Sequence, residues 1–220
     1  MQLEILYEDQ EVIVCYKPAG ISVQTKKIGE ADVESLLKTH LKGGYLAVIH
    51  RLDQPVEGLL VFAKTPFAAK ELNKGLQGAG FGKYYKAVLW GNVEKDKALL
   101  EDYLVKDGRT NTSRVGTANE RDAKKALLRY EVLAKGKEGE KDISLVKIQL
   151  ETGRHHQIRV QMAHMGCPIW GDAKYNTAQI QDRRFRPIAL CAYRLEFVHP
   201  RSKEKKVFEI EPRGEGFLLL

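Results

Sequence analysis

Short apolar segments, many of them joined by connections of hairpin length, recur along this chain and constrain its fold more than any other feature. Alternating or continuous apolar runs of this length are typical of β-strands. The predicted strands cover residues 3–7, 12–16, 45–49, 58–64, 84–90, 126–133, 143–150, 189–198 and 206–211. Because many of these strands follow one another directly, we expect a largely antiparallel sheet.

Three helices are predicted between the strands. Apolar residues at positions 33, 36, 37 and 41 indicate a helix over 32–41, and Thr65 followed by Pro66 begins a second helix that ends before Gly78. Thr152 is the expected cap of a third helix, over about 155–165. Residues 92–125 are polar and charged, 135–142 form a loop, and neither segment is assigned a strand. The expected class is α+β, with a mixed, largely antiparallel central sheet flanked by helices.

Composition places the chain among soluble globular proteins, with 43% apolar and 30% charged residues over 220 positions. The longest strongly apolar run, residues 59–63, is far shorter than a membrane span, and the acidic start shows no signal peptide. Three widely spaced cysteines, Cys15, Cys167 and Cys191, indicate buried thiols in a reducing compartment. We therefore expect a cytoplasmic protein without a membrane segment.

The net charge of +7 favours a polyanionic partner but does not identify one. Residues 182–206 hold eight Lys or Arg against three Asp or Glu. Within them, Arg183 and Arg184 beside Phe185 form a candidate edge for phosphate contacts. A solvated surface has the same composition, so both interpretations stand at this point.

Two polar segments carry the candidate chemistry. Asp53, in His50-Arg51-Leu52-Asp53-Gln54-Pro55, follows one predicted strand and precedes another, which suits either a functional carboxylate or an ordinary turn before Pro55. Residues 151–159 contain two arginines, two histidines and a glutamine close to the start of a predicted helix. Cations there require a negative partner, either a phosphate or a carboxylate such as Asp53. The alternative is that Arg154 and Arg159 face solvent, although Arg159 lies beside the predicted buried stripe.

Other chemistries lack their signatures. His155 and His156 are adjacent and His164 is eight residues beyond His156, which does not match known metal-ligand spacings. The sequence has no nucleophile elbow, Walker loop or dinucleotide fingerprint. We expect neither a metal nor a cofactor. On the predicted strand 84–90, Tyr84 and Tyr85 point to opposite faces, so only one of them faces a given pocket.

Together these segments resemble the RluA-type family of RNA pseudouridine synthases. The resemblance rests on three motifs: HRLD followed by GLLVFAKT, KYYKAVLWG, and ETGRHHQIRVQMAHMGCPIWGDAKY. Three further segments show a weaker similarity to the family: YKPAGISV, AKKALLRYEVL and LCAYRLEFVHP. The likeness covers almost the whole chain in the family's order, and it aligns Tyr85, not Tyr84, with the motif tyrosine. It departs where the aspartate motif commonly continues D-x-x-T-S-G, because Val56 and Glu57 stand there, and where Gln161 replaces a frequent histidine.

The resemblance implies a single catalytic domain over residues 1–220, an active-site cleft across the sheet, and no separate N-terminal RNA-binding module. It implies Asp53 as the essential carboxylate, either a nucleophile or a base, Tyr85 as the residue that stacks on the base, and Arg159 as the partner of Asp53. Arg51 is a candidate to fill the stack that a flipped-out uridine leaves. The remaining expected RNA contacts are His50, Arg154, Gln157, Arg183 and Arg184.

The expected substrate is a stem-loop of ribosomal or transfer RNA, and a monomer is the default state. Two other functions remain open. One is a non-catalytic RNA-binding protein that retains the fold. The other is a glycosidase, which needs a second carboxyl group such as Asp172 or Glu151 at about 5–9.5 Å from the first.

Overall fold

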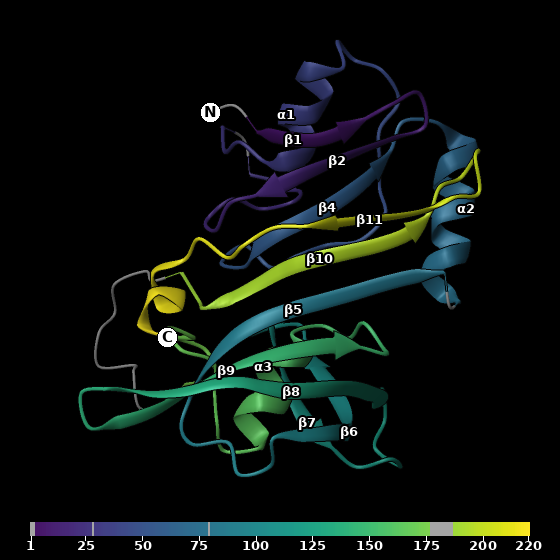
Figure 1. The fold of residues 1–220 in the computed structure, drawn as a ribbon. Helices are drawn as coiled ribbons and strands as arrows, with labels where there is room; N and C mark the ends of the chain where they lie inside the picture. The colour runs from purple at the N-terminus through teal and green to yellow at the C-terminus, as the bar shows by residue number, and fades with distance from the viewer. Residues whose placement is uncertain (1–2, 28, 79, 177–186) are drawn as a thin grey trace. The chain divides into compact units, whose positions relative to one another are not determined.

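A computed structural model describes residues 3–27, 29–78, 80–176 and 187–220 of the chain (Figure 1). The described chain forms two compact units. Residues 1–83 and 191–212 make up the first unit, and residues 84–190 and 213–220 make up the second. Each unit is described by itself.

The first unit is built on strands β1 (Glu4–Glu8), β2 (Val12–Lys17), β4 (Glu57–Ala63), β10 (Leu190–Val198) and β11 (Lys205–Glu209), which pair in that order. Short strand β3 (Ala47–Val48) also pairs with β4. Every pair is antiparallel except β4 with β10, which is parallel. The predicted hairpin of β1 and β2 is confirmed.

Two helices belong to the first unit. Asp32 caps α1 (Val33–His40), because its carboxylate accepts a hydrogen bond from the amide of Ser35 at 2.7 Å. Thr65 caps α2 (Pro66–Gln77) in the same way, and Pro66 begins the helix as predicted. Leu72 of α2 packs with Val61 of β4 and Phe197 of β10 in one buried cluster. This cluster is the core of the unit.

Gly58 shows why a glycine follows the aspartate loop. Its φ of +134° is a conformation that side-chain-bearing residues rarely adopt, and a Cβ atom there would lie 2.5 Å from the backbone nitrogen of Ala192. Only glycine therefore allows β4 to begin this close to β10.

The second unit is an antiparallel sheet in the order β5-β9-β8-β6-β7. Its strands are β5 (Phe81–Trp90, which begins in the first unit), β6 (Lys97–Asp107), β7 (Thr112–Gly116), β8 (Lys124–Glu138) and β9 (Lys141–Leu150). Helix α3 (Gln157–His164) and the short 3₁₀ helix η2 (Glu215–Leu219) complete the unit. Val88 and Ile143 pack with Trp170 and Phe217 at one end of the sheet.

Three expectations about the second unit were wrong. Strands β6 and β7 occupy the segment that was assigned none, and β8 and β9 extend through the expected loop 135–142 to a tight turn at Gly139. The charged residues of these strands face outward and pair across them, as Lys125 does with Glu101 at 2.7 Å. Thr152 does not cap α3; the capping position is His156.

The α+β class and the largely antiparallel pairing are confirmed in both units. All three cysteines are buried and unbridged, as expected. No helix in the described part of the chain is long and apolar enough to cross a membrane.

Candidate active-site residues

Asp53 lies in the connection between β3 and β4 of the first unit, with its side chain partly exposed. The neighbouring side chain of Leu52 is buried and anchors the loop. The backbone carbonyl of Asp53 accepts a hydrogen bond from the amide of Val56 at 3.1 Å, so the residue also begins a turn. The turn and the accessible carboxylate are therefore compatible at this position.

The aspartate loop is fastened to the turn that follows β2. The carbonyl of Gln54 accepts hydrogen bonds from the amide of Gly20 at 2.8 Å and from the Lys17 ammonium at 3.1 Å. In return, the Gln54 side chain donates to the carbonyl of Gly20 at 3.0 Å. The sequence motif YKPAG thus has a physical role that sequence reasoning did not assign, which is to fix the peptide next to Asp53.

Lys17 is fully buried, which is unusual for lysine. Its ammonium also donates to the carbonyl of Pro18 at 3.0 Å. Burial lowers the pKa of Lys17 to about 7, against the opposing effect of the nearby carboxylates of Asp53 and Glu57. The Lys17 side chain, in the same unit as Asp53, is therefore half protonated near pH 7.

His50 supports the start of the loop. Its Nε2 atom accepts a hydrogen bond from the amide of Val61 at 3.3 Å, one step beyond the last β3–β4 pair. The ring packs edge-on against Phe81. Burial, with a smaller effect from Lys83, lowers the pKa of His50 to about 3, so the imidazole is neutral at physiological pH.

Arg51 is exposed, and its guanidinium is held by Gln24. Its guanidinium donates from Nε and Nη2 to the side-chain oxygen of Gln24 at 3.0 and 2.6 Å. Gln24 in turn donates to Glu34 of α1 at 2.6 Å. Any movement of Arg51 into an RNA stack requires the release of Gln24.

Tyr85 lies on β5 in the second unit, opposite Ile148 of β9. Its side chain is buried, with 7% exposed, whereas Tyr84 on the other face is partly exposed. The alternation predicted from the sequence is confirmed, and Tyr85 is the tyrosine on the enclosed face.

Arg159 of α3 forms a bidentate ion pair with Asp172. Nε and Nη2 of the guanidinium lie 2.7 and 2.8 Å from the two carboxylate oxygens, and both side chains are buried. The ring of Tyr175 lies 5.2 Å from the guanidinium carbon. Sequence reasoning gave Asp172 and Tyr175 no role in holding the arginine, although both belong to the quoted motif GDAKY. Within the second unit, Asp172 supplies the carboxylate partner that the cations at this helix start require.

The start of α3 is tied to the β6–β7 hairpin. His156 adopts a left-handed conformation, with φ of +53°, and its Nδ1 atom lies 2.7 Å from the hydroxyl of Tyr175. The same hydroxyl accepts a hydrogen bond from the amide of Ser113 on β7 at 2.8 Å. His155 stacks on His156 at 3.8 Å and contacts the Ser113 hydroxyl. Both histidines are thus held by protein groups.

Gln157 and Arg154 differ in exposure. The Gln157 side chain is buried, accepts from the Thr152 hydroxyl and the Arg154 amide at 2.8 and 2.9 Å, and donates to the carbonyl of Leu127 at 3.0 Å. It therefore shapes the loop before α3. Arg154 is exposed and donates from Nε to the carbonyl of Lys125. Arg183 and Arg184 lie outside the described residues.

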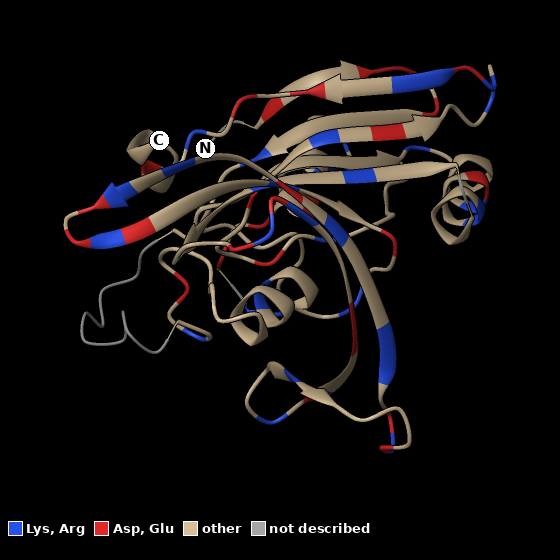
Figure 2. Cartoon of the chain, turned by 60° about the horizontal axis from the view of Figure 1, so that its bottom comes forward, with Lys and Arg blue, Asp and Glu red and all other residues tan. Residues whose placement is uncertain are grey.

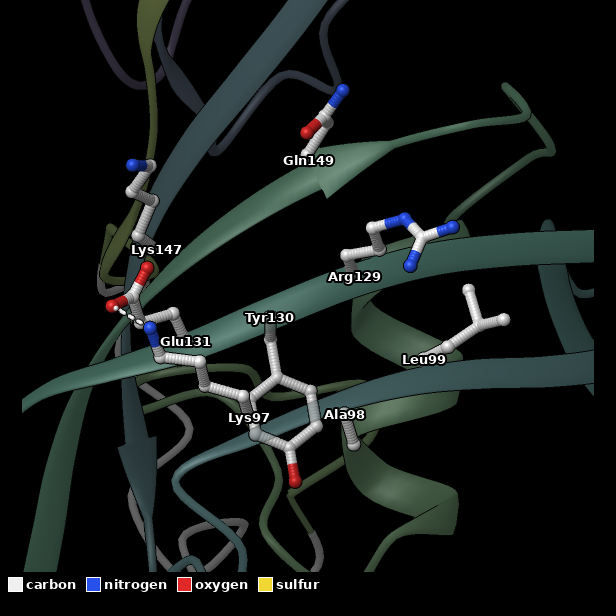
Figure 3. A pocket seen from close by; sticks show the side chains of 8 residues that line it. All are labelled: Lys97, Ala98, Leu99, Arg129, Tyr130, Glu131, Lys147 and Gln149. Atoms are coloured by element: carbon white, nitrogen blue, oxygen red, sulfur yellow. Dashed lines mark ion pairs between the residues drawn. The ribbon is translucent and has the colours of Figure 1, made fainter.

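Figure 2 shows Lys and Arg interleaved with Asp and Glu along the strands, and some of them pair across neighbouring strands, as Lys125 of β8 does with Glu101 of β6. A hollow of about 390 Å³ on β6, β8 and β9 illustrates this, because Lys97 and Glu131 pair there at 2.8 Å (Figure 3). Lys147 in this hollow is opposite Lys86, one residue from Tyr85, so the hollow opens on the face away from Tyr85. We do not consider it the candidate site.

Among the residues that the structure describes, no group of three or more His, Cys, Asp or Glu side chains is arranged to hold a metal ion. The candidate residues thus form two sets. Asp53 with Lys17, His50 and Arg51 belongs to the first unit, and Tyr85 with Arg159 belongs to the second.

Comparison with protein families finds a match to the model of RNA pseudouridylate synthase over residues 11–164. An uncharacterized RNA pseudouridine synthase of Bacillus subtilis is 36% identical over 95% of this chain and 69% of its own length. A dual-specificity RNA pseudouridine synthase of Pasteurella multocida is 32% identical over 96% of this chain and 93% of its own. A tRNA pseudouridine synthase C of Vibrio cholerae is 30% identical over 93% and 89% of the two chains.

Among solved structures, human RNA pseudouridylate synthase domain containing 1 matches with a TM-score of 0.81. It is 23% identical and covers 96% of this chain and 84% of its own. At that identity the match shows the shared fold.

Proposed function

The chain belongs to the RluA-type family of RNA pseudouridine synthases, isomerases that convert uridine in RNA to pseudouridine, and from that premise we propose that Asp53 is its essential carboxylate. The observation that carries the proposal is the loop itself. Asp53 is partly exposed, while the adjacent peptide is fixed by Gly20 and Lys17 and the preceding Leu52 is buried. A reactive group on a rigidly held loop is what catalysis requires.

The reaction breaks the N-glycosidic bond, turns the uracil and joins its C5 carbon to the ribose, without a net change of redox state. Two routes are open to Asp53. The carboxylate either adds covalently to the nucleoside or removes a ribose proton to give a glycal-like intermediate. Both need an ionised carboxylate, which a neighbouring cation favours.

Arg159 and Tyr85 are the proposed partners from the second unit. Asp172 and the ring of Tyr175 orient the Arg159 guanidinium, which we propose pairs with Asp53. The enclosed Tyr85 is proposed to stack on the uracil and to assist the proton transfer at C5.

A uridine within a stem must leave the stack before Asp53 reaches it, at a cost of a few kcal/mol. We propose that Arg51 releases Gln24 and fills the vacated position with its planar guanidinium. Arg154, Arg183 and Arg184 are proposed to contact phosphates. We propose that His50, which is neutral, forms a hydrogen bond to the substrate and not a charge contact. Gln157 is proposed to act by positioning Arg154.

The proposed substrate is a stem-loop of ribosomal or transfer RNA, recognised by a monomer. A relative named as a tRNA pseudouridine synthase supports transfer RNA as a substrate, and a relative named as a dual-specificity RNA pseudouridine synthase supports more than one kind of target.

The observations support the two other functions, a glycosidase and a non-catalytic RNA-binding protein, less well. A glycosidase needs a second accessible carboxyl group, but Asp172 is buried in its pair with Arg159, and the exposed carboxylate of Glu151 is held in a surface ion pair with Arg129 at 3.0 Å. A non-catalytic RNA-binding protein would not need Asp53, Tyr85 and Arg159 together. It remains the alternative that the following experiment decides.

The test uses total RNA from a strain that lacks the gene, incubated with the wild-type protein or Asp53→Ala and mapped for pseudouridine site by site. New pseudouridine with the wild type alone supports the enzyme, assigns Asp53 and identifies the RNA. Equal signal with both proteins would remove Asp53 as the catalyst. RNA binding without pseudouridine from either protein would favour the non-catalytic alternative.

A further inference from the structure

The hollow on β6, β8 and β9 lies in the second unit, on the face of the sheet away from Tyr85 (Figure 3). A row of charged side chains crosses this face. Lys147 of β9 is opposite Glu131 of β8, and Glu131 is in turn opposite Lys97 of β6. Residues that are directly opposite each other on neighbouring strands share a face of the sheet. The hollow therefore has a lysine on each side of a central glutamate.

Positive charge exceeds negative charge in this hollow. Among the described residues that line it, Lys97, Arg129 and Lys147 are basic and Glu131 alone is acidic. Lys97 pairs with Glu131 at 2.8 Å, and its side chain is 71% exposed. Arg129 pairs with Glu151, outside the hollow, and its side chain is 60% exposed. The cations of the hollow are thus accessible to a ligand from solvent.

Lys147 is the least compensated of the three cations. It forms no ion pair with another residue of the described chain. Its direct neighbour on the other side, on β5, is Lys86. Like charges directly opposite each other destabilise a sheet, so this position costs the fold stability. A bound anion would offset that cost.

The arrangement suits a polyanion better than a single anion. Lys147 and Lys97 are separated by two inter-strand steps in the order β9-β8-β6, which amounts to about 10 Å between their backbones. The carboxylate of Glu131 stands between them and repels an anion placed at the centre. A strand with repeated phosphates places its charges on either side of this carboxylate.

We propose that this hollow binds the sugar-phosphate backbone of an RNA segment outside the target uridine. The inference rests on the proposed function, because the RNA bound here is the substrate. Lys147 and Lys97 contact phosphates on the two sides of Glu131, and the Arg129 guanidinium contacts a further phosphate. The hollow takes no part in the chemistry, since Tyr85 faces the opposite side of the sheet.

Fluorescence anisotropy with a labelled oligoadenylate strand measures this binding without the reaction, because the strand contains no uridine. The loss of one phosphate contact to a single strand lowers the slope of log affinity against log salt concentration by about 0.7. Lys147→Gln is expected to lower the slope by this amount and to weaken binding several-fold at low salt. Glu131→Gln removes the acidic group and releases Lys97, so it is expected to tighten binding.

Lys141→Gln is the matched control. It removes the same charge from an exposed position on β9, about 20 Å along the strand from Lys147. It should leave the slope unchanged. Equal slopes for Lys147→Gln and Lys141→Gln would overturn the inference, because net charge alone would then explain the binding. Binding of polyglutamate but not of oligoadenylate would also overturn it, in favour of an acidic protein partner.

Urea unfolding of Lys147→Gln, with a midpoint at or above that of the wild type, would exclude loss of the fold as the cause of weaker binding. If the midpoint falls, Arg129→Gln replaces it in the same assay, with the same expected change of slope.

With the RNA identified by pseudouridine mapping, Lys147→Gln is expected to raise KM several-fold and to leave kcat unchanged. A loss in kcat alone would contradict a binding role on this face. Absence of pseudouridine from the wild type would overturn the proposed function instead. The oligoadenylate measurement does not depend on activity, so it separates the two failures.

Discussion

Arg159 and Asp172 are held by a double hydrogen bond in a buried environment, with exposed fractions of 4% and 0%. A buried ion pair adds little net stability by itself, but removal of one partner leaves an uncompensated charge. Such a pair fixes the orientation of the guanidinium more than it stabilises the fold. This is the requirement for an arginine that is proposed to act on Asp53.

Asp172→Asn is therefore expected to destabilise the protein by about 3–5 kcal/mol, because the Arg159 charge stays buried without its counter-ion. Urea unfolding measures the loss. Asp122→Asn, whose side chain is 83% exposed, is the control and should unfold like the wild type. Equal midpoints for Asp172→Asn and the control would show that the pair has no structural importance.

Lys17 gives a second prediction at this scale. Burial lowers its pKa from an ordinary 10.5 to about 7, so between these values the unfolded chain binds a proton that the folded protein does not. The free energy of unfolding contributed by this residue consequently rises with pH over that range. The difference in unfolding free energy between the wild type and Lys17→Met should move in favour of the wild type from pH 6.5 to pH 9. The same difference at both pH values would contradict the lowered pKa of Lys17.

The resemblance of three sequence motifs to the family identified Asp53, Tyr85 and Arg159 as candidates. It did not identify Asp172 as a partner of Arg159, since a separation of 13 positions places no constraint on which carboxylate the arginine meets. The burial of Lys17 could not be predicted from the sequence either, because a lysine that ends a strand is ordinarily exposed.

At the scale of elements, α2 shows how a helix start is joined to the core. Thr65 accepts a hydrogen bond from the amide of Ala68 at 3.0 Å and donates to the buried carboxylate of Glu11 at 2.6 Å. Arg201, which follows β10, pairs with the same carboxylate. The Thr65 hydroxyl thereby links the start of α2 to Glu11 and, through the Glu11 carboxylate, to Arg201.

Thr65→Ala is expected to cost about 1–2 kcal/mol, because it removes the cap and leaves Glu11 with one hydrogen bond fewer. Thermal or urea unfolding measures the effect. Thr117→Ala, at an exposed turn, changes the same atoms without a cap and should be neutral within about 0.5 kcal/mol. A loss no larger than that of the control would rule out Thr65 as a stabilising cap.

Helices and buried strands were the predictable elements, because α1, α2, β2 and β4 have clear periodicity or continuous apolar runs. Strands β6 and β7 were missed since their exposed faces carry charged residues that pair across the sheet, a pattern that resembles a loop when one strand is read alone. The cap of α3 was missed because His156 caps through a left-handed backbone and not through a side chain.

At the scale of the whole molecule, the net charge of +7 predicts that RNA binding depends on salt. Each phosphate that Lys or Arg neutralises releases counterions, so the logarithm of the affinity should fall linearly with the logarithm of salt concentration. Filter binding or fluorescence anisotropy at several salt concentrations gives the slope. An affinity that is independent of salt would contradict phosphate contacts by Arg154, Arg183 and Arg184.

The proposed role of Asp53 in isomerising uridine is tested most directly by single-turnover rates of pseudouridine formation. Asp53→Asn keeps the shape of the side chain and removes its charge, and Asp122→Asn is the exposed control. Asp53→Asn is expected to bind the substrate RNA with an affinity near that of the wild type but to form pseudouridine at least about a thousand-fold more slowly. Pseudouridine formation at the wild-type rate by Asp53→Asn would contradict the proposed role.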